Sequence, residues 1–156
     1  NSMKILIIED NKNKMLCLKE FIAKMDLSEK VEFEEANSFT SGIRKINNKI
    51  GEIIILDMSL PTYDITHWEN GGDKKPVAGK EIMKRMIHRN ILIPVIIVTQ
   101  FETFGENRIT LDILNKEFEN EFKKEWKGRI FYEGDEWKEG LEQLLREIIR
   151  KREKND

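Results

Sequence analysis

The sequence is poor in cysteine, in long apolar runs and in net charge, and each shortage excludes something. Its single cysteine, Cys17, excludes an internal disulfide, and its place in an apolar helical pattern predicts a buried, unreactive thiol. The longest apolar runs, at residues 5–8, 53–56 and 91–99, are far shorter than a membrane span. Nothing in the sequence resembles a signal peptide. We therefore expect a soluble, cytoplasmic protein that has no membrane partner.

The charges nearly cancel, because 27 basic residues stand against 29 acidic ones and leave a net charge of -2. This balance argues against nucleic acid as a direct partner. The basic segment at residues 150–154 ends a predicted helix, where cations complement the helix dipole. We interpret that segment as a solvated helix end.

The length of 156 residues suits one domain, which we expect to span residues 3–154. Asn1 and Ser2 precede a Met-Lys start, and we expect both to be additions before a natural N-terminus at Met3.

Five short segments have the apolar patterns of strands, and five others have the spacing of helices. The predicted strands are residues 4–8, 31–36, 53–57, 94–99 and 129–132. The predicted helices are residues 12–25, 39–50, 79–88, 103–126 and a last one from residue 135 onward. Thr103 and Glu106 have the spacing of a capping box, and Asp135 is predicted to cap the last helix.

The fourth predicted helix carries an apolar stripe that ends in aromatic residues. The stripe consists of Ile109, Ile113, Leu114, Phe118 and Phe122, and Trp126 follows it. Two interpretations stay open for the aromatic end, which is either additional core or a docking face for a partner.

The alternation of strands and helices predicts a doubly wound α/β fold, with a five-stranded parallel sheet and helices on both faces. In such sheets ligands bind beyond the carboxyl ends of the strands. Glu9 and Asp10 follow the first strand, Asp57 ends the third, and Thr99 ends the fourth. We therefore expect these four side chains to meet at one edge of the sheet.

Three carboxylates at one edge repel one another unless a proton or a cation neutralises them. Because all the donors are oxygen atoms, the pattern favours Mg²⁺. A carboxylate such as that of Asp57 can also attack a phosphoryl group, with Mg²⁺ and the hydroxyl of Thr99 neutralising its oxygens. The alternative is that the acids only end strands or cap the helices that follow.

Three motifs together resemble the receiver domains of bacterial two-component response regulators, over residues 3–152. They are Met3-Lys-Ile-Leu-Ile-Ile-Glu-Asp-Asn11, Ile55-Leu-Asp-Met-Ser-Leu-Pro61 and Val95-Ile-Ile-Val-Thr99. The resemblance implies a flavodoxin-like fold with strand order 2-1-3-4-5. It also implies an Mg²⁺-dependent phosphoacceptor that performs no catalysis beyond its own phosphorylation and dephosphorylation.

The resemblance assigns a role to each residue of the site. It implies that Glu9, Asp10, Asp57 and the backbone carbonyl of Ser59 hold Mg²⁺. Asp57 is then the phosphoacceptor, and Thr99 hydrogen-bonds the phosphoryl group and moves toward it.

The resemblance also implies a switch residue and partners. The aromatic switch position falls at Ile130 or Phe131, and we favour Phe131. The implied partners are a histidine kinase or phosphotransfer protein and a downstream protein target. The fourth helix, fifth strand and fifth helix form the expected contact surface, which is also a candidate for homodimer contacts.

The chain departs from the family pattern at the end of the fifth strand. The family has a lysine there that pairs with the phosphoryl group, whereas this chain reads Phe131-Tyr-Glu-Gly134. Glu133 would repel a phosphate unless it points away. Lys138 is the nearest substitute along the chain, and Gln100 follows Thr99 where the family has a small residue.

A second departure is the long segment from Thr62 to Ala78, which replaces a short turn beside the acids. It is either a lid over the site or an exposed insertion that packs Trp68 on the surface. We interpret His67 as structural, because no other metal-ligating residue accompanies it.

Three functions fit this sequence. The first is a phosphoacceptor receiver, and the second is a pseudo-receiver that binds proteins without phosphorylation. The third is an Mg²⁺-dependent phosphohydrolase, which would lack a second aspartate two residues after Asp57, where Ser59 stands.

Overall fold

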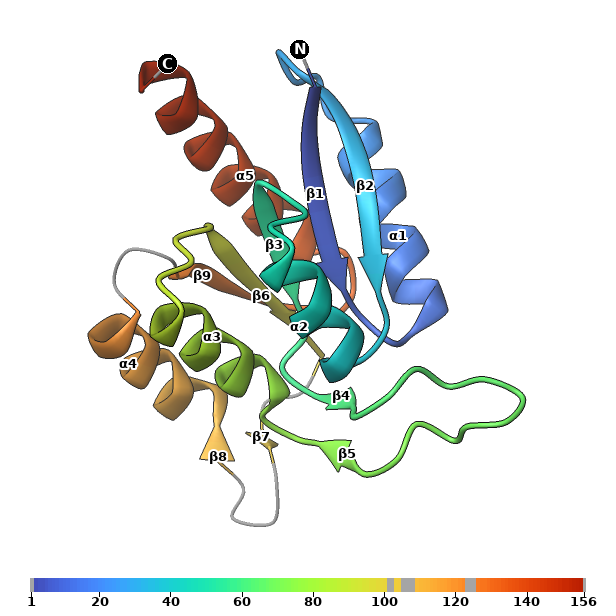
Figure 1. Cartoon of the computed structure of the whole chain (residues 1–156). Helices are drawn as coiled ribbons and strands as arrows, with labels where there is room; N and C mark the ends of the chain where they lie inside the picture. Colours follow the sequence, from blue (N-terminus) through green and yellow to red (C-terminus); the bar gives the residue numbers. More distant parts are fainter. Residues whose placement is uncertain (1, 101–102, 105–108, 123–125, 156) are drawn as a thin grey trace.

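The computed structural model describes residues 2–100, 103–104, 109–122 and 126–155. Its centre is a parallel sheet of five strands (Figure 1). These strands are β1 (Ser2–Ile8), β2 (Lys30–Ala36), β3 (Ile53–Leu56), β6 (Val95–Thr99) and β9 (Trp126–Phe131). Their order, β2-β1-β3-β6-β9, is the predicted order 2-1-3-4-5, so the flavodoxin-like topology is confirmed.

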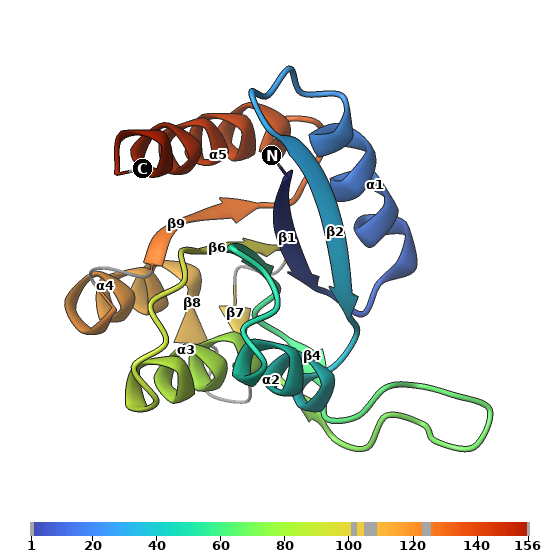
Figure 2. The same ribbon diagram turned by 45° about the horizontal axis from the view of Figure 1, so that its top comes forward.

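Helices cover both faces of this sheet (Figures 1 and 2). They are α1 (Lys12–Ala23), α2 (Phe39–Asn47), α3 (Ala78–His88), α4 (Leu111–Glu121) and α5 (Trp137–Lys154). One core cluster joins α1 and α5 to the sheet, and a second joins α2, α3 and the aromatic end of α4. β1 supplies both cores, because Ile5 and Ile7 face the first cluster whereas Leu6 and Ile8 face the second. Among the described residues no helix has the length and apolar character needed to cross a membrane.

Side-chain caps begin the two helices that follow the first two strands. The Asn11 side chain accepts a hydrogen bond from the backbone N–H of Lys14 at 2.9 Å and starts α1. Ser38 and Ser41 form a reciprocal capping box at the start of α2. The cap at Asn11 matters for the predicted metal site, because it fixes the first turn of α1 directly after Glu9 and Asp10.

The predicted helix at residues 103–126 is wrong at both ends. Thr103–Phe104 forms a short strand, β7, which pairs antiparallel with β8 (Ile109–Thr110), while Glu106 lies outside the described residues. α4 then runs only from Leu111 to Glu121, and Trp126 already belongs to β9. Pairing of β9 with β6 outweighs the helical spacing of the apolar residues here, because tertiary contacts override a local pattern.

The aromatic end of α4 is part of the core. Phe118 and Phe122 are both 2% exposed, and their ring centroids lie 5.1 Å apart in an edge-on arrangement. Trp126 packs against Phe118 with centroids 5.9 Å apart. The predicted stripe does not extend to Ile113, which is 51% exposed.

Two smaller predictions also need correction. Cys17 is exposed, because the buried side of α1 is formed by Lys14, Met15, Leu18 and Ile22, and Cys17 lies beside that stripe. Asp135 does not cap α5, which begins after Glu136 with no side-chain cap. The Asp135 carboxylate instead pairs with the ammonium of Lys138 at 3.2 Å.

The inserted segment after β3 is a ribbon that projects from the body of the domain (Figure 2). Its base is formed by β4 (Leu60–Pro61) paired antiparallel with β5 (Lys74–Lys75). The Asp64 carboxylate accepts a hydrogen bond from the Ser41 hydroxyl at 2.8 Å, which ties the ribbon to α2. Trp68 is 96% exposed, so the insertion is exposed as one of the two interpretations had it, although the Trp68 side chain packs on little else.

Candidate functional site

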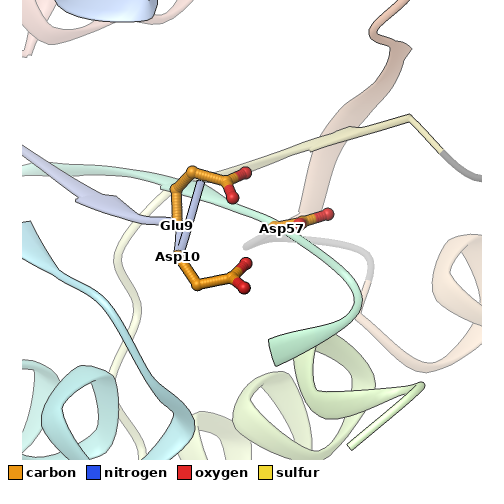
Figure 3. Close-up of side chains that lie close together, drawn as sticks. All are labelled: Glu9, Asp10 and Asp57. Atoms are coloured by element: carbon orange, nitrogen blue, oxygen red, sulfur yellow. The ribbon is translucent and has the colours of Figure 1, made fainter. Parts of the chain in front are cut away.

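The acidic residues follow two neighbouring strands whose ends are level. Ile8 of β1 is the register partner of Leu56 of β3, so Glu9 and Asp57 come next on adjacent strands. The backbone N–H of Asp57 donates to the carbonyl of Ile8 at 3.0 Å. Carboxylate oxygens of Glu9, Asp10 and Asp57 all lie within 4.8 Å of one another (Figure 3). The structure thus brings together the three acids of the predicted metal site.

Two of these acids are deeply buried. Glu9 is 2% exposed and Asp57 is 5% exposed, whereas Asp10 stands at the rim of the site with its side chain 23% exposed. Burial, and next the charge of Asp57, raise the pKa of Glu9 to about 8, although Lys14 and the backbone N–H of Asn11 act in the opposite direction. The buried pair of Glu9 and Asp57 therefore attracts a cation or a proton.

A buried lysine already lies between the acids. Lys14, in the first turn of α1, is 2% exposed, and its ammonium is 2.5 Å from Oε1 of Glu9. The same Nζ is 2.6 Å from the carbonyl oxygen of Val98 and 3.5 Å from Oδ1 of Asp57. One ammonium therefore connects the carboxyl ends of β1, β3 and β6.

Sequence reasoning missed Lys14, although the sequence contains a signal for it. Lys14 precedes Leu18 by four residues, so it falls on the apolar stripe of α1 and must be buried with it. It also lies in the first turn of a helix, where the dipole disfavours a cation. A lysine that breaks both rules beside an acidic pair indicates a specific ion pair.

Lys138 does not take the place of the missing lysine. Its ammonium pairs with Asp135 and lies 5.7 Å from the ring centroid of Trp137. Glu133 is exposed and is not a member of the acidic cluster found among the described residues. Lys138 is the nearest lysine along the chain after the end of β9, but the lysine that lies near Asp57 in space comes from α1 and not from that segment.

The residue that follows β9 is Tyr132, and it packs beside Lys14. Its ring centroid is 5.4 Å from the Lys14 Nζ and 4.9 Å from the ring centroid of Trp137. Burial and a hydrogen bond with Cys17 raise the pKa of Tyr132 to about 12, so the phenol stays protonated at neutral pH. A neutral aromatic ring therefore occupies the flank of the site where β9 ends.

The other predicted site residues lie on the same edge of the sheet or next to it. Thr99 is fully buried at the end of β6 and is the register partner of Phe131. Ser59 is 7% exposed and stands two residues after Asp57, while Gln100 is exposed. Their roles stay predictions.

The backbone around Asp57 is held closely by α3. Oδ1 of Asp57 accepts a hydrogen bond from the N–H of Met58 at 2.8 Å, and the N–H of Gly79 donates to the carbonyl of Met58 at 2.9 Å. A Cβ on Gly79 would lie 3.1 Å from the carbonyl oxygen of Asp57. Glycine at this position therefore permits the close approach of the helix that fixes the acid.

A second lysine reaches the rim of the site from the insertion. The ammonium of Lys74 in β5 is 3.5 Å from Oδ2 of Asp10, and its side chain is 53% exposed. His67 lies on the exposed part of the ribbon and is not in the acidic cluster of the described residues. The insertion thus contributes one solvent-exposed cation near the acids.

The donor set fits a hard divalent cation such as Mg²⁺. All three side chains offer carboxylate oxygens, and the partly exposed Asp10 leaves one side of the cluster open to solvent. Oε1 of Glu9 makes no well-angled hydrogen bond among the described residues and has only the ion pair with Lys14.

Comparison with known proteins gives two relatives of similar length and many similar folds. No family model matches the sequence. The Detocs response regulatory protein DtcB of Enterobacter cloacae (strain JD6301) is 37% identical over 111 residues, which cover 67% of this chain and 70% of DtcB. The uncharacterized protein y4jR of Sinorhizobium fredii (strain NBRC 101917 / NGR234) is 36% identical over 135 residues, or 83% of this chain and 87% of y4jR.

Solved structures share the fold at low sequence identity. The crystal structure of a response regulator receiver domain protein from Clostridium thermocellum superposes with a TM-score of 0.63 and 18% identity. The superposition covers 99% of this chain and 99% of that structure.

Proposed function

This chain belongs to the receiver domains of response regulators, and we propose that its Asp57 accepts a phosphoryl group in an Mg²⁺-dependent signalling step. The observation that carries the proposal is the convergence of Glu9, Asp10 and Asp57 within 4.8 Å at the carboxyl edge of the sheet. Phosphoryl transfer needs positioning and charge neutralisation more than covalent assistance, and this cluster would supply both by holding Mg²⁺ beside Asp57.

The proposed step is a direct displacement at phosphorus. A carboxylate oxygen of Asp57 forms a new O–P bond while the bond from phosphorus to the donor nitrogen of a phosphohistidine breaks. The leaving imidazole keeps the electron pair of that bond and takes a proton from solvent. Water later attacks the phosphorus, breaks the bond to Asp57 and releases inorganic phosphate.

Glu9, Asp10 and Asp57 would hold the ion, with the backbone carbonyl of Ser59 as a further ligand. When bound, Mg²⁺ supplies positive charge to the oxygens of the transferred group. Asp10 lies at the exposed rim, so it suits a ligand that exchanges with water, whereas the buried Glu9 suits a ligand that stays fixed.

Thr99 and Phe131 are the proposed switch residues. They are register partners on β6 and β9, so a shift of Thr99 toward a phosphoryl group bears directly on Phe131. The surface that would respond consists of α4, β9 and α5. We propose that this domain works in the cytoplasm, where a histidine kinase or phosphotransfer protein supplies the phosphoryl group. A downstream protein, or a second copy of this chain, would bind that surface.

A second candidate is a pseudo-receiver that binds proteins without being phosphorylated. It is favoured by the Lys14 ammonium, which already contacts Glu9 and Asp57 as a metal ion would. In that case the ion pair replaces Mg²⁺ permanently, and the domain keeps one conformation.

Intact-mass spectrometry separates the two candidates. The protein is incubated with Mg²⁺ and acetyl phosphate, and we expect one added phosphate that is absent without Mg²⁺ and absent in Asp57→Asn. Wild-type protein that binds neither Mg²⁺ nor phosphate under these conditions would instead support the pseudo-receiver.

A further inference from the structure

We propose that Lys14 is the cation that binds the phosphoryl group on Asp57 and that it replaces the lysine missing from the end of β9. This inference rests on the proposed function of Asp57. It assigns a catalytic role to a residue of α1, an element that supplies none of the acids.

Distance and burial place Lys14 at the reacting group. Its Nζ lies 3.5 Å from Oδ1 of Asp57, the oxygen that also accepts the N–H of Met58. The side chain is 2% exposed, so few water molecules can screen its charge from a group attached to Asp57. No other lysine or arginine among the described residues has an ion pair with Asp57.

The ammonium has a donor to spare on the side of Asp57. A lysine carries three N–H donors; one donates to the carbonyl of Val98 at 2.6 Å, and the closest ion pair is with Oε1 of Glu9 at 2.5 Å. The contact to Asp57 is looser, at 3.5 Å. An oxygen of a phosphoryl group on Asp57 would give another of these donors a stronger partner.

Charge balance favours a cation beside the phosphoryl group on Asp57. Phosphorylation adds negative charge to a cluster that already contains Glu9, Asp10 and Asp57. Bound Mg²⁺ would neutralise the cluster from the side of the acids, and the family lysine would neutralise the phosphoryl oxygens from the end of β9. In this chain Tyr132 follows β9 instead, and its ring lies against the Lys14 ammonium.

The surroundings of Lys14 hold its charge in place. The Asn11 side chain caps the backbone N–H of Lys14, and the backbone N–H of Asn11 donates to Oε2 of Glu9 at 2.8 Å. The start of α1 and the acid of β1 therefore form one hydrogen-bonded unit. A positioned donor of this kind is effective in catalysis because it needs no reorganisation during the reaction.

A purely structural role for Lys14 predicts different behaviour. If the ammonium only holds the acids in position, its loss disturbs their arrangement and lowers the Mg²⁺ affinity and the phosphorylation rate together. If it binds the phosphoryl group, its loss slows phosphorylation, while Mg²⁺ binds at least as tightly because a competing positive charge has left the acids. The two measurements then move in opposite directions.

The test compares wild type, Lys14→Met and the matched control Lys138→Met. Mg²⁺ affinity is measured by calorimetry, and the rate of phosphorylation by acetyl phosphate is followed by intact mass. We expect Lys14→Met to be phosphorylated about 100-fold more slowly, the usual loss for one positioned donor, with Mg²⁺ affinity equal to or above wild type. Lys138→Met should match wild type in both measurements.

Each outcome decides the inference. An unchanged phosphorylation rate in Lys14→Met overturns it while leaving the proposed function intact, and so does a parallel loss of Mg²⁺ affinity and rate. Wild type that is never phosphorylated removes the proposed function itself.

A second measurement covers the case in which Lys14→Met does not fold. Nitrogen NMR of the lysine ammonium groups follows wild-type protein, with Lys14→Arg identifying the Lys14 signal by its absence. With Mg²⁺ present, beryllofluoride as a phosphoryl mimic should shift the Lys14 signal. A signal that does not move overturns the inference.

Discussion

The raised pKa of Glu9 predicts a steep dependence of Mg²⁺ affinity on pH. Burial and the charge of Asp57 raise the pKa of this carboxyl to about 8, and the metal binds only its ionised form. With that pKa, about 1% of Glu9 is ionised at pH 6 and about half at pH 8. The apparent affinity for Mg²⁺ should therefore increase about 50-fold over this range.

Calorimetric titration with Mg²⁺ from about pH 6 to pH 8 measures this directly. Titrations in two buffers with different heats of ionisation should also show that nearly one proton leaves the protein for each ion bound near pH 7. Glu9→Gln is the control, because the amide cannot titrate and should bind Mg²⁺ more weakly with little dependence on pH. A protein that binds Mg²⁺ with the same affinity at pH 6 and pH 8 would refute the reasoning, since Glu9 would then be ionised throughout.

The Glu9 carboxyl also affects folding stability, and its raised pKa determines how the free energy of unfolding changes with pH. A carboxyl whose pKa is higher in the folded state binds more protons there than in the unfolded state, so the free energy of unfolding falls as pH rises from about 4.5 to about 8. The rise of the Glu9 pKa from 4.5 to about 8 sets an upper bound of about 5 kcal/mol on this loss. Saturating Mg²⁺ should restore stability at the alkaline end, as urea unfolding at several pH values would measure.

Three substitutions test, through folding stability, the packing of the core, the cap of α1 and the exposure of the insertion. Phe118→Ala should lower the free energy of unfolding by about 3–5 kcal/mol in urea denaturation, because it leaves a cavity beside Phe122; a loss below about 1 kcal/mol would contradict the packing. Asn11→Ala removes the cap of α1 and should cost about 1 kcal/mol in the same assay, and an unchanged stability would argue that this cap is dispensable. Trp68→Ser should change stability by less than about 0.5 kcal/mol, since the side chain is 96% exposed, and a larger change would place Trp68 in a contact that the structure lacks.

The sheet and its acidic edge were accessible from the sequence for a simple reason. Apolar runs such as 53–56 are continuous because both faces of a central parallel strand are buried, and the strand must end where a charged residue begins. Glu9 and Asp57 both occupy such an end, and parallel strands bring their carboxyl ends to one edge. The convergence of the acids therefore follows from local pattern and topology together.

Patterns of helical spacing were less informative, because they identify the apolar face of a helix but not the element that packs against that face. The stripe from Phe118 to Trp126 has helical spacing, yet Trp126 pairs in the sheet and packs on Phe118 from there. Cys17 also fits an apolar pattern but lies just outside the buried stripe. In both cases contacts between distant elements decided the outcome. Helical spacing alone does not fix where a helix ends or which residues at the edge of an apolar stripe are buried.

The amino-acid order was sufficient for the strand order, for the identity of the three acids and for the absence of a lysine after β9, because each depends on local composition and general rules of topology. It was insufficient for the origin of the cation at Asp57. That depends on where the first turn of α1 packs against three strand ends, and only the folded chain brings Lys14 within 3.5 Å of Asp57.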